Sequence, residues 1–281
     1  MKVAEIRRKC VEKLRCAEVE RPEYVTDILL SKVLNISRPL LITKYDDELS
    51  ADESGALYAM CEKRAKRVPL SYIIGESEFY GRIFKVGNGS LIPRPETELL
   101  ADALLKLVPN AEKFADWCTG SGCIGITLLL EMPRAVAYGI DSSADALKWA
   151  EANSSMYDLG ARFSLICESE PLICPIEPGS LDFIVSNPPY IPSSEIAGLM
   201  SDVRDYEPHE ALDGGADGLD IYRKLILAAS LFLKPGGYFA VETGGDLQSG
   251  QLLKIVGGNF SLSNKIYDYN GILRHLIWQV F

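Results

Sequence analysis

The first 67 residues place apolar side chains at the spacing of amphipathic helices. A second apolar run covers residues 26–34. A stripe of this spacing covers one face of a helix, and that face becomes buried. We therefore expect residues 1–68 to form a small all-helical domain. The first stripe consists of Val3, Ile6, Cys10, Val11 and Leu14.

A third helix is predicted to begin at Ser50. Ser50 and Glu53 have the spacing of a capping box, in which the serine side chain accepts from the Glu53 amide and the glutamate reaches back. The helix is expected to run to the basic cluster at 63–67, where positive charge suits a helix C-terminus.

The pattern changes at Val68-Pro69, because a residue that precedes proline disfavours the helical conformation. Residues 71–86 alternate apolar and polar positions and are interrupted by Gly75 and Gly81. This pattern predicts a short β-hairpin, and we expect residues 69–92 to link two domains.

Strands and helices alternate in the remainder, residues 93–281, after a predicted helix at 96–108. The predicted strands are 113–117, 135–140, 163–167, 181–186 and 238–241, with two further candidates at 262–267 and 275–280. The predicted helices are 123–131, 144–154 and 219–233, the last ended by residues 234–237. Such alternation is typical of an α/β domain with a mostly parallel sheet and helices on both faces.

The two parts of the chain differ in charge. Residues 1–75 hold 14 basic and 12 acidic residues, a net charge of +2, whereas residues 76–281 hold 15 and 27, a net charge of −12. Phosphate contacts need a basic surface, so the acidic part is a poor candidate for direct nucleic-acid binding. The difference also suggests two domains with different partners.

Other classes of protein fit the composition poorly. The longest apolar run, residues 225–233 with a break at Ser230, is far shorter than a membrane span. The charged first 15 residues lack the apolar core of a signal peptide. Seven irregularly spaced cysteines, no C-x-x-C motif and only two histidines predict neither a disulfide framework nor a metal site. We expect a cytoplasmic protein with reduced thiols and no membrane partner.

A glycine loop follows the first strand of the α/β part. Gly120, Gly122 and Gly125 match G-x-G-x-x-G, and Asp141 closes the next strand. Such glycines let a ligand lie against the backbone, and an acid at this spacing can accept from ribose hydroxyls. The pattern indicates a nucleoside-cofactor site. Nicotinamide cofactors and S-adenosylmethionine both use this geometry, and a plain tight turn with a helix-capping aspartate is the structural alternative.

The predicted strand at 181–186 runs directly into Asn187-Pro188-Pro189-Tyr190. Two prolines cannot continue the hydrogen bonds of a parallel sheet, so the chain must leave at the carboxyl edge, where ligands of open α/β folds bind. The position favours function over a plain proline-rich turn.

The residue types suit methylation of a planar NH₂ group. The Asn187 side-chain oxygen and the Pro188 carbonyl can both accept from such a group and aim its lone pair at an electrophilic methyl. The prolines fix φ and so pre-aim the carbonyl, and the Tyr190 ring can cover the planar group. This is catalysis by positioning, and it needs no histidine base.

These motifs together resemble the bacterial peptide chain release factor N5-glutamine methyltransferases, the HemK/PrmC family. The resemblance covers residues 69–281 well, and residues 1–68 only in length and helical character. Its most specific local signature is the segment 91–98. Further matching segments are 69–75, 78–81, 203–208 and 211–215.

The resemblance implies a Rossmann-like class I methyltransferase fold. It also implies S-adenosylmethionine as the cofactor and the glutamine of the Gly-Gly-Gln loop of class 1 release factors as the substrate. Asn187, Pro188, Pro189 and Tyr190 would grip that glutamine, and residues 1–68 would dock a remote part of the release factor. We expect a monomer. The residues implied to hold the cofactor are Cys118, Thr119, Gly120, Ser121, Gly122, Asp141 and Asn187, with Glu168 as the candidate on the adenine side.

One position departs from the family pattern, which usually has glycine where Cys118 stands. Cysteine is costly there if the position needs a positive φ, and tolerated if only a small residue is required. We expect the second case, because Gly120 and Gly122 remain.

Three other functions compete with this assignment. A nucleic-acid adenine or cytosine amino-methyltransferase shares the Asn-Pro-Pro-Tyr motif but is disfavoured by the charge of −12. A nicotinamide-dependent dehydrogenase leaves residues 187–190 unexplained. A non-catalytic binding module is at odds with an intact Asn-Pro-Pro-Tyr motif.

Overall fold

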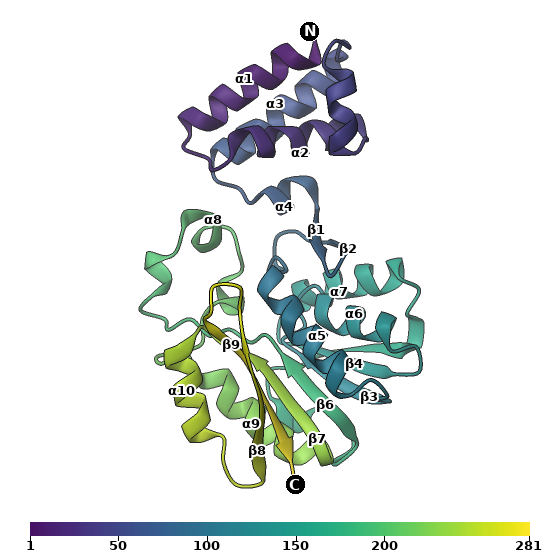
Figure 1. The fold of residues 1–281 in the computed structure, drawn as a ribbon, viewed down its shortest axis with the longest axis vertical. Helices are drawn as coiled ribbons and strands as arrows, with labels where there is room; N and C mark the ends of the chain where they lie inside the picture. The colour runs from purple at the N-terminus through teal and green to yellow at the C-terminus, as the bar shows by residue number, and fades with distance from the viewer. The chain divides into compact units, whose positions relative to one another are not determined.

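The computed structural model describes residues 1–281, which form two compact units (Figure 1). Unit 1 consists of Met1–Glu76 together with the distant segment Met200–Tyr206, and unit 2 consists of Ser77–Leu199 and Glu207–Phe281. The residues expected to form a linker, 69–92, are shared by the two units. The three-part scheme of 1–68, 69–92 and 93–281 stays a prediction.

Unit 1 is helical, as expected from its apolar spacing. Most of the predicted stripe of α1 lies in one apolar core with Leu29 and Leu30 of α2 and with Leu41, Leu57 and Cys61. The capping box is confirmed: Ser50 Oγ accepts from Glu53 N (3.1 Å), and Ser50 N donates to Glu53 Oε2 (2.8 Å). Its helices are α1 (Val3–Cys16), α2 (Pro22–Leu34), α3 (Ala51–Ala65), α4 (Leu70–Ile74) and α8 (Ser201–Arg204), with a 3₁₀ turn, η1, at Arg38–Lys44.

The segment Met200–Tyr206 joins unit 1 through polar contacts with the end of α3. Asp202 Oδ2 lies 2.7 Å from Arg64 Nη2, and the Tyr206 hydroxyl donates to the Lys66 carbonyl (2.6 Å). The Arg64 guanidinium also donates to the Val68 carbonyl (2.9 Å). The contacts of Asp202 and Tyr206 close a chain loop of more than 130 residues, a pairing that local sequence patterns do not reveal.

The predicted hairpin exists but is shorter than expected. It consists of β1 (Glu76–Phe79) and β2 (Arg82–Lys85), whereas residues 70–74 form the helix α4 instead of a strand. Leu70, Ile73 and Ile74 have i, i+3, i+4 spacing and pack on the core of unit 1, so the helical period prevailed over the alternation.

Unit 2 contains a seven-stranded sheet in the order β5-β4-β3-β6-β7-β9-β8 (Figure 1). The strands from β5 to β7 pair in parallel, and β9 pairs antiparallel with both β7 and β8. The mostly parallel sheet is therefore confirmed. Its strands are β3 (Lys113–Trp117), β4 (Val136–Asp141), β5 (Phe163–Cys167), β6 (Leu181–Ser186), β7 (Leu233–Glu242), β8 (Phe260–Tyr267) and β9 (Leu273–Val280).

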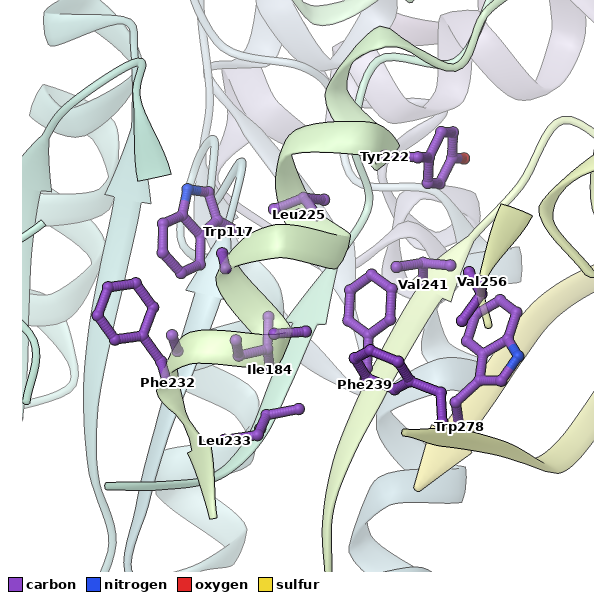
Figure 2. Close-up of a cluster of buried hydrophobic side chains, with 14 of the residues drawn as sticks. Trp117, Ile184, Tyr222, Leu225, Phe232, Leu233, Phe239, Val241, Val256 and Trp278 are labelled. Atoms are coloured by element: carbon purple, nitrogen blue, oxygen red, sulfur yellow. The ribbon is translucent and has the colours of Figure 1, made fainter. Parts of the chain in front are cut away.

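Helices cover both faces of the sheet, as predicted. Side chains alternate along the buried strands: Phe183 and Val185 face the helices α5 to α7, and Ile184 faces α9 and α10. Figure 2 shows the second face, where Phe239 stacks on Trp278 with ring centroids 5.7 Å apart. These helices are α5 (Glu98–Leu107), α6 (Cys123–Glu131), α7 (Ala144–Met156), α9 (Asp220–Phe232) and α10 (Asp246–Ile255).

Two details of unit 2 differ from the sequence prediction. Leu233 was expected to end a helix, but it pairs with Leu181 and begins β7, so residues 234–237 lie at an irregular strand start instead of in a loop. Helix α10 was not predicted, because its apolar stripe is weak and follows directly after Gly244 and Gly245.

Candidate active site

The carboxyl ends of three neighbouring parallel strands meet at one cavity, and each leads into a predicted site segment. Strand β3 leads into Cys118 and Gly120, the neighbouring β4 ends at Asp141, and β6 on the other side of β3 leads into Asn187 and Pro189. All five line a cavity of about 820 Å³ at the carboxyl ends of the strands. This is the point of an open α/β sheet where the strand order reverses and ligands bind.

The far wall of the cavity comes from residues beyond the Asn-Pro-Pro-Tyr motif. The Asp220 carboxylate there accepts from Arg223 (2.9 Å), and Lys224 pairs with Glu170 (2.6 Å). Acidic groups outnumber the basic ones in the wall, which suits a cationic ligand. The remaining lining residues are Gly89, Leu91, Ser142, Ser143, Ala146, Pro208, His209, Glu210, Ala211, Asp213, Gly214, Gly215 and Ile221.

The glycine loop has the left-handed backbone that glycine favours. Gly120 has φ of 56° and Gly122 has φ of 80°, and Cys118 has φ of 58°. The expectation that position 118 needs only a small residue was therefore wrong. A left-handed conformation brings Cβ close to backbone atoms, so cysteine is strained where glycine would not be. Burial raises the pKa of the Cys118 thiol, and the nearby Asp141 carboxylate raises it further.

Asp116 holds the loop through hydrogen bonds, and the sequence predicted no role for it. Its buried carboxylate accepts from Thr119 Oγ1 (2.6 Å) and from Gly125 N (2.9 Å) through Oδ2, while Oδ1 has no partner. A Cβ on Gly125 would lie 2.9 Å from Asp116 Oδ2, so this glycine permits the close approach. Burial raises the pKa of Asp116 to about 7. A charged residue inside a buried strand was the signal that could have indicated it.

Asp141 is tied to the loop by backbone hydrogen bonds. Its Oδ2 accepts from Gly120 N and its Oδ1 accepts from Ser143 N, both at 2.9 Å. Burial raises the pKa of this carboxyl, and the backbone donors partly oppose that effect. Each carboxylate oxygen has two lone pairs, so both can still accept from a ligand.

Several predicted cofactor residues lie outside the cavity lining. Thr119 donates to Asp116 as described, and Ser121 is buried. Gly122 caps the N-terminus of α6, and the added Cβ would lie 2.8 Å from Ile126. The Glu168 side chain accepts from the backbone amides of Ser169 (2.8 Å) and Glu170 (3.0 Å). A role for Glu168 beside the cofactor stays a prediction.

Asn187 is half-buried at the cavity, and its side-chain nitrogen donates to Thr97 Oγ1 (3.2 Å). Pro188 is buried and not part of the lining, whereas Pro189 is part of it. Tyr190 packs on the hydrophobic core with its carbonyl accepting from Gln248 Nε2 (2.9 Å), and burial raises the pKa of Tyr190 to about 12.

A partly buried ion pair joins the segment 91–98 to the loop after the site. Arg94 Nη2 donates to Glu207 Oε1 (2.6 Å), and Ile92 N donates to Glu207 Oε2 (3.2 Å). Glu207 immediately precedes Pro208 of the cavity wall. Arg94 and Glu207 belong to segments that resemble the family, 91–98 and 203–208, but no local sequence pattern indicates that they pair.

No helix is long and apolar enough to cross a membrane, and no group of three or more His, Cys, Asp or Glu side chains is arranged to hold a metal ion.

Similarity to solved structures supports the fold. The ribosomal protein L11 methylase of Lactobacillus delbrueckii subsp. bulgaricus matches with a TM-score of 0.50 at 18% identity, covering 73% of this chain and 89% of that one. The hMettl16 catalytic domain, in complex with the MAT2A 3'UTR hairpin 6, matches with a TM-score of 0.56 at 14% identity, covering 83% of each chain. At such identities the likeness shows the fold alone, and the expected methyltransferase fold is confirmed.

Sequence comparisons define the family. A model described as the PrmC N-terminal domain matches residues 5–75, and one described as the methyltransferase small domain matches residues 95–200. The release factor glutamine methyltransferase of Moorella thermoacetica is 38% identical over 268 residues, 94% of this chain and 93% of the relative. That of Geobacter sulfurreducens is 41% identical over 226 residues, 80% and 78% of the two chains. With the resemblance of its motifs confirmed, this chain belongs to the release factor glutamine methyltransferases and is an enzyme of the methyltransferase class.

Proposed function

We propose that this chain transfers a methyl group from S-adenosylmethionine to the side-chain amide nitrogen of the glutamine in the Gly-Gly-Gln motif of class 1 release factors. The observation that carries the proposal is the convergence of the glycine loop, Asp141 and Asn187 on one cavity. The release factor glutamine methyltransferase of Moorella thermoacetica matches 94% of this chain. Nothing in the structure favours the nucleic-acid alternative.

The residues present fit the cofactor. Gly120 lines the cavity, and a Cβ added there would meet no atom within 4 Å, so its missing side chain leaves room against the backbone. Asp141 offers free lone pairs to ribose hydroxyls, and the acidic wall suits a cation. When bound, S-adenosylmethionine supplies an electrophilic methyl group on a positively charged sulfur. Cys118 to Gly122 and Asp141 are the residues that we assign to its binding.

Asn187 and Pro188 position the glutamine amide. An amide nitrogen is a poor nucleophile because its lone pair is delocalised, so the protein must hold the NH₂ group with the lone pair aimed at the methyl. The Asn187 side-chain oxygen and the Pro188 carbonyl accept one N–H each. Pro189 keeps the backbone rigid, and the Tyr190 ring covers the planar amide and excludes water.

The helical unit is assigned to partner docking. Every residue that lines the cavity belongs to unit 2, so unit 1 is not needed to form the walls of the site. Its match to the PrmC N-terminal domain supports a role specific to this family. We assign it the recognition of a remote part of the release factor by a monomeric enzyme, without direct contact to nucleic acid.

Methyl mapping tests the proposal. Purified chain is incubated with isotope-labelled S-adenosylmethionine and a class 1 release factor, and the labelled residue is located by mass spectrometry. We expect one methyl on the glutamine of Gly-Gly-Gln, at a rate that falls about 100-fold or more for Asn187→Ala because the amide is no longer positioned. Label on nucleic acid only, or none on the release factor, would contradict the proposal.

A further inference from the structure

The segment 91–98 is the most specific motif of the sequence, but the proposed chemistry gives Thr97 no task. Thr97 ends the 3₁₀ turn η2 (Pro95–Thr97) and is only 2% exposed. Its hydroxyl is the partner of Asn187 Nδ2 (3.2 Å). Thr97 therefore touches the side chain on which the positioning of the substrate depends.

The hydrogen bonds around Thr97 have a fixed direction. Thr97 Oγ1 also donates to Glu242 Oε2 (2.6 Å). The single hydroxyl proton of Thr97 therefore points to Glu242, and only a donor can face the threonine oxygen from the other side. The NH₂ group of Asn187 meets that requirement, which leaves its oxygen Oδ1 directed away from Thr97 and free to accept.

Glu242 is itself held from a second side. It ends β7 opposite His275 on β9, and His275 Nε2 lies 3.3 Å from the same oxygen, Oε2. Glu242 and His275 are 2% and 0% exposed. The Tyr222 hydroxyl donates to the Glu242 carbonyl (2.5 Å), which fixes the backbone at this point. His275 Nδ1 has no partner, so the only hydrogen bond of the His275 side chain is the one to Glu242.

Burying a carboxylate this deeply is costly, and apolar side chains of similar volume would serve stability at least as well. The chain of contacts instead leads through Thr97 to one group that lines the cavity. We propose that Thr97, Glu242 and His275 form a buried relay that orients the Asn187 side-chain amide, with its NH₂ inward and its oxygen toward the substrate. The relay consists of positioning residues, and its effect on rate rests on the proposed function of Asn187.

Without the relay, the Asn187 amide can turn over and present a donor where the substrate needs an acceptor. Thr97→Val keeps the shape of the side chain and removes the hydroxyl. We expect the single-turnover rate of methyl transfer, with S-adenosylmethionine and release factor both saturating, to fall about 10- to 100-fold. The dissociation constant for the cofactor should stay within about threefold. Thr97→Ser keeps the hydroxyl and should restore the rate to within about threefold of wild type.

A matched control is Thr127→Val on α6. Thr127 is fully buried, and its hydroxyl has no hydrogen-bond partner, so this variant also removes a buried hydroxyl but touches no relay. Its rate should stay within about twofold of wild type. A wild-type rate for Thr97→Val, or an equal loss in Thr127→Val, would overturn the relay.

A double-mutant comparison separates orientation of Asn187 from a general structural role. In an Asn187→Ala background, Thr97→Val should cause no further loss of rate, because the group that it orients is gone. Additive losses would overturn the proposal, since Thr97 would then act by another route.

A readout without turnover keeps the relay testable if the wild type fails to methylate release factor. The Asn187 side-chain NH₂ signals in a ¹⁵N-edited NMR spectrum can be assigned as those missing from Asn187→Ala. They should shift in Thr97→Val and in Glu242→Gln, and stay in place in Thr127→Val. Unshifted signals in both relay variants would overturn the relay, whereas absent methylation by wild type alone would overturn the proposed function.

Discussion

The two units bury different kinds of side chain. In unit 1 the buried polar residues are Thr26, which donates to the Pro22 carbonyl (2.8 Å), and Arg64. Unit 2 buries the acids Asp116, Glu207, Glu242 and Asp268.

Three of these four acids serve the surroundings of the cavity. Asp116 holds the glycine loop, Glu207 holds the segment 91–94, and Glu242 connects through Thr97 to Asn187, whereas Asp268 accepts from Asn270 N (2.8 Å) in the turn between β8 and β9. A buried polar or charged group lowers stability unless it is well satisfied. The positions of these acids therefore indicate where side-chain geometry is kept at a cost in stability. Unit 1 by contrast buries no acid, and its interior is an apolar core.

The largest effect is expected at Asp141. Asp141→Ala removes the carboxylate that we assign to the cofactor ribose, and the loss of two charge-assisted hydrogen bonds should weaken S-adenosylmethionine binding by about 2–4 kcal/mol, measured by calorimetry. The control is Asp145→Ala, which removes an exposed acid that pairs with Lys148 (2.6 Å). An unchanged dissociation constant for Asp141→Ala would remove this residue from the site.

Asp116 should make stability depend on pH. Its pKa is about 7 in the fold against an ordinary 3.8, so between pH 4 and 7 the folded protein keeps a proton that the unfolded chain has released. The free energy of unfolding should therefore decrease as pH rises through this range, by about 2–4 kcal/mol from this group.

Asp116→Asn cannot titrate and should lack that contribution. Urea denaturation at several pH values, without cofactor, gives the difference between wild type and variant. A difference that does not vary between pH 4 and 7 would show that this buried acid keeps an ordinary pKa, and the contrast between the units would lose its clearest case.

A substitution of Arg64 tests whether unit 1 can lose stability without an effect on the cofactor site in unit 2. Arg64→Ala removes the ion pair with Asp202 and should lower the stability of this unit by about 1–3 kcal/mol, while leaving cofactor affinity unchanged. Hydrogen exchange of the amides in residues 203–205 should become faster. Lys13→Ala breaks an exposed pair with Glu62 and should have an effect below about 0.5 kcal/mol. A large loss of cofactor affinity in Arg64→Ala would contradict the separation of roles.

The smallest effect is expected at Cys118. Cys118→Gly removes the strain of a positive φ but adds backbone entropy to the unfolded chain, so stability should rise by only about 0–1 kcal/mol. Cys118→Ala is the control, because alanine keeps the strain. Equal stabilisation by both substitutions, measured by thermal unfolding, would show that the backbone conformation is not the cause.

The sequence predicted the elements in which apolar residues recur at regular spacing and whose ends carry capping or turn residues. The strands β3, β4 and β6 and the capping box at Ser50 are of this kind. It failed where tertiary packing decides between two periods, as at Leu70–Ile74, and where a strand begins at an irregular pairing, as at Leu233.

For the site, the sequence located the segments but not their supports. Cys118 and Asn187 follow strands and Asp141 ends one, and the carboxyl ends of parallel strands meet at one edge. Their supporting partners are far away in the chain: Thr97 lies 90 residues from Asn187 and 145 from Glu242. No local pattern encodes such a pair, and the backbone angle of Cys118 depends equally on its three-dimensional setting.

The return of Met200–Tyr206 to the helical unit has a consequence for folding during synthesis. The ribosome releases Arg64 long before Asp202 exists, so the helical unit cannot form its contacts with Asp202 and Tyr206 until these residues have been made. N-terminal parts ordinarily fold first as the chain emerges. Here the helical unit is expected to form its apolar core early and to become fully stable late, only after the strands β3 to β6 have left the ribosome.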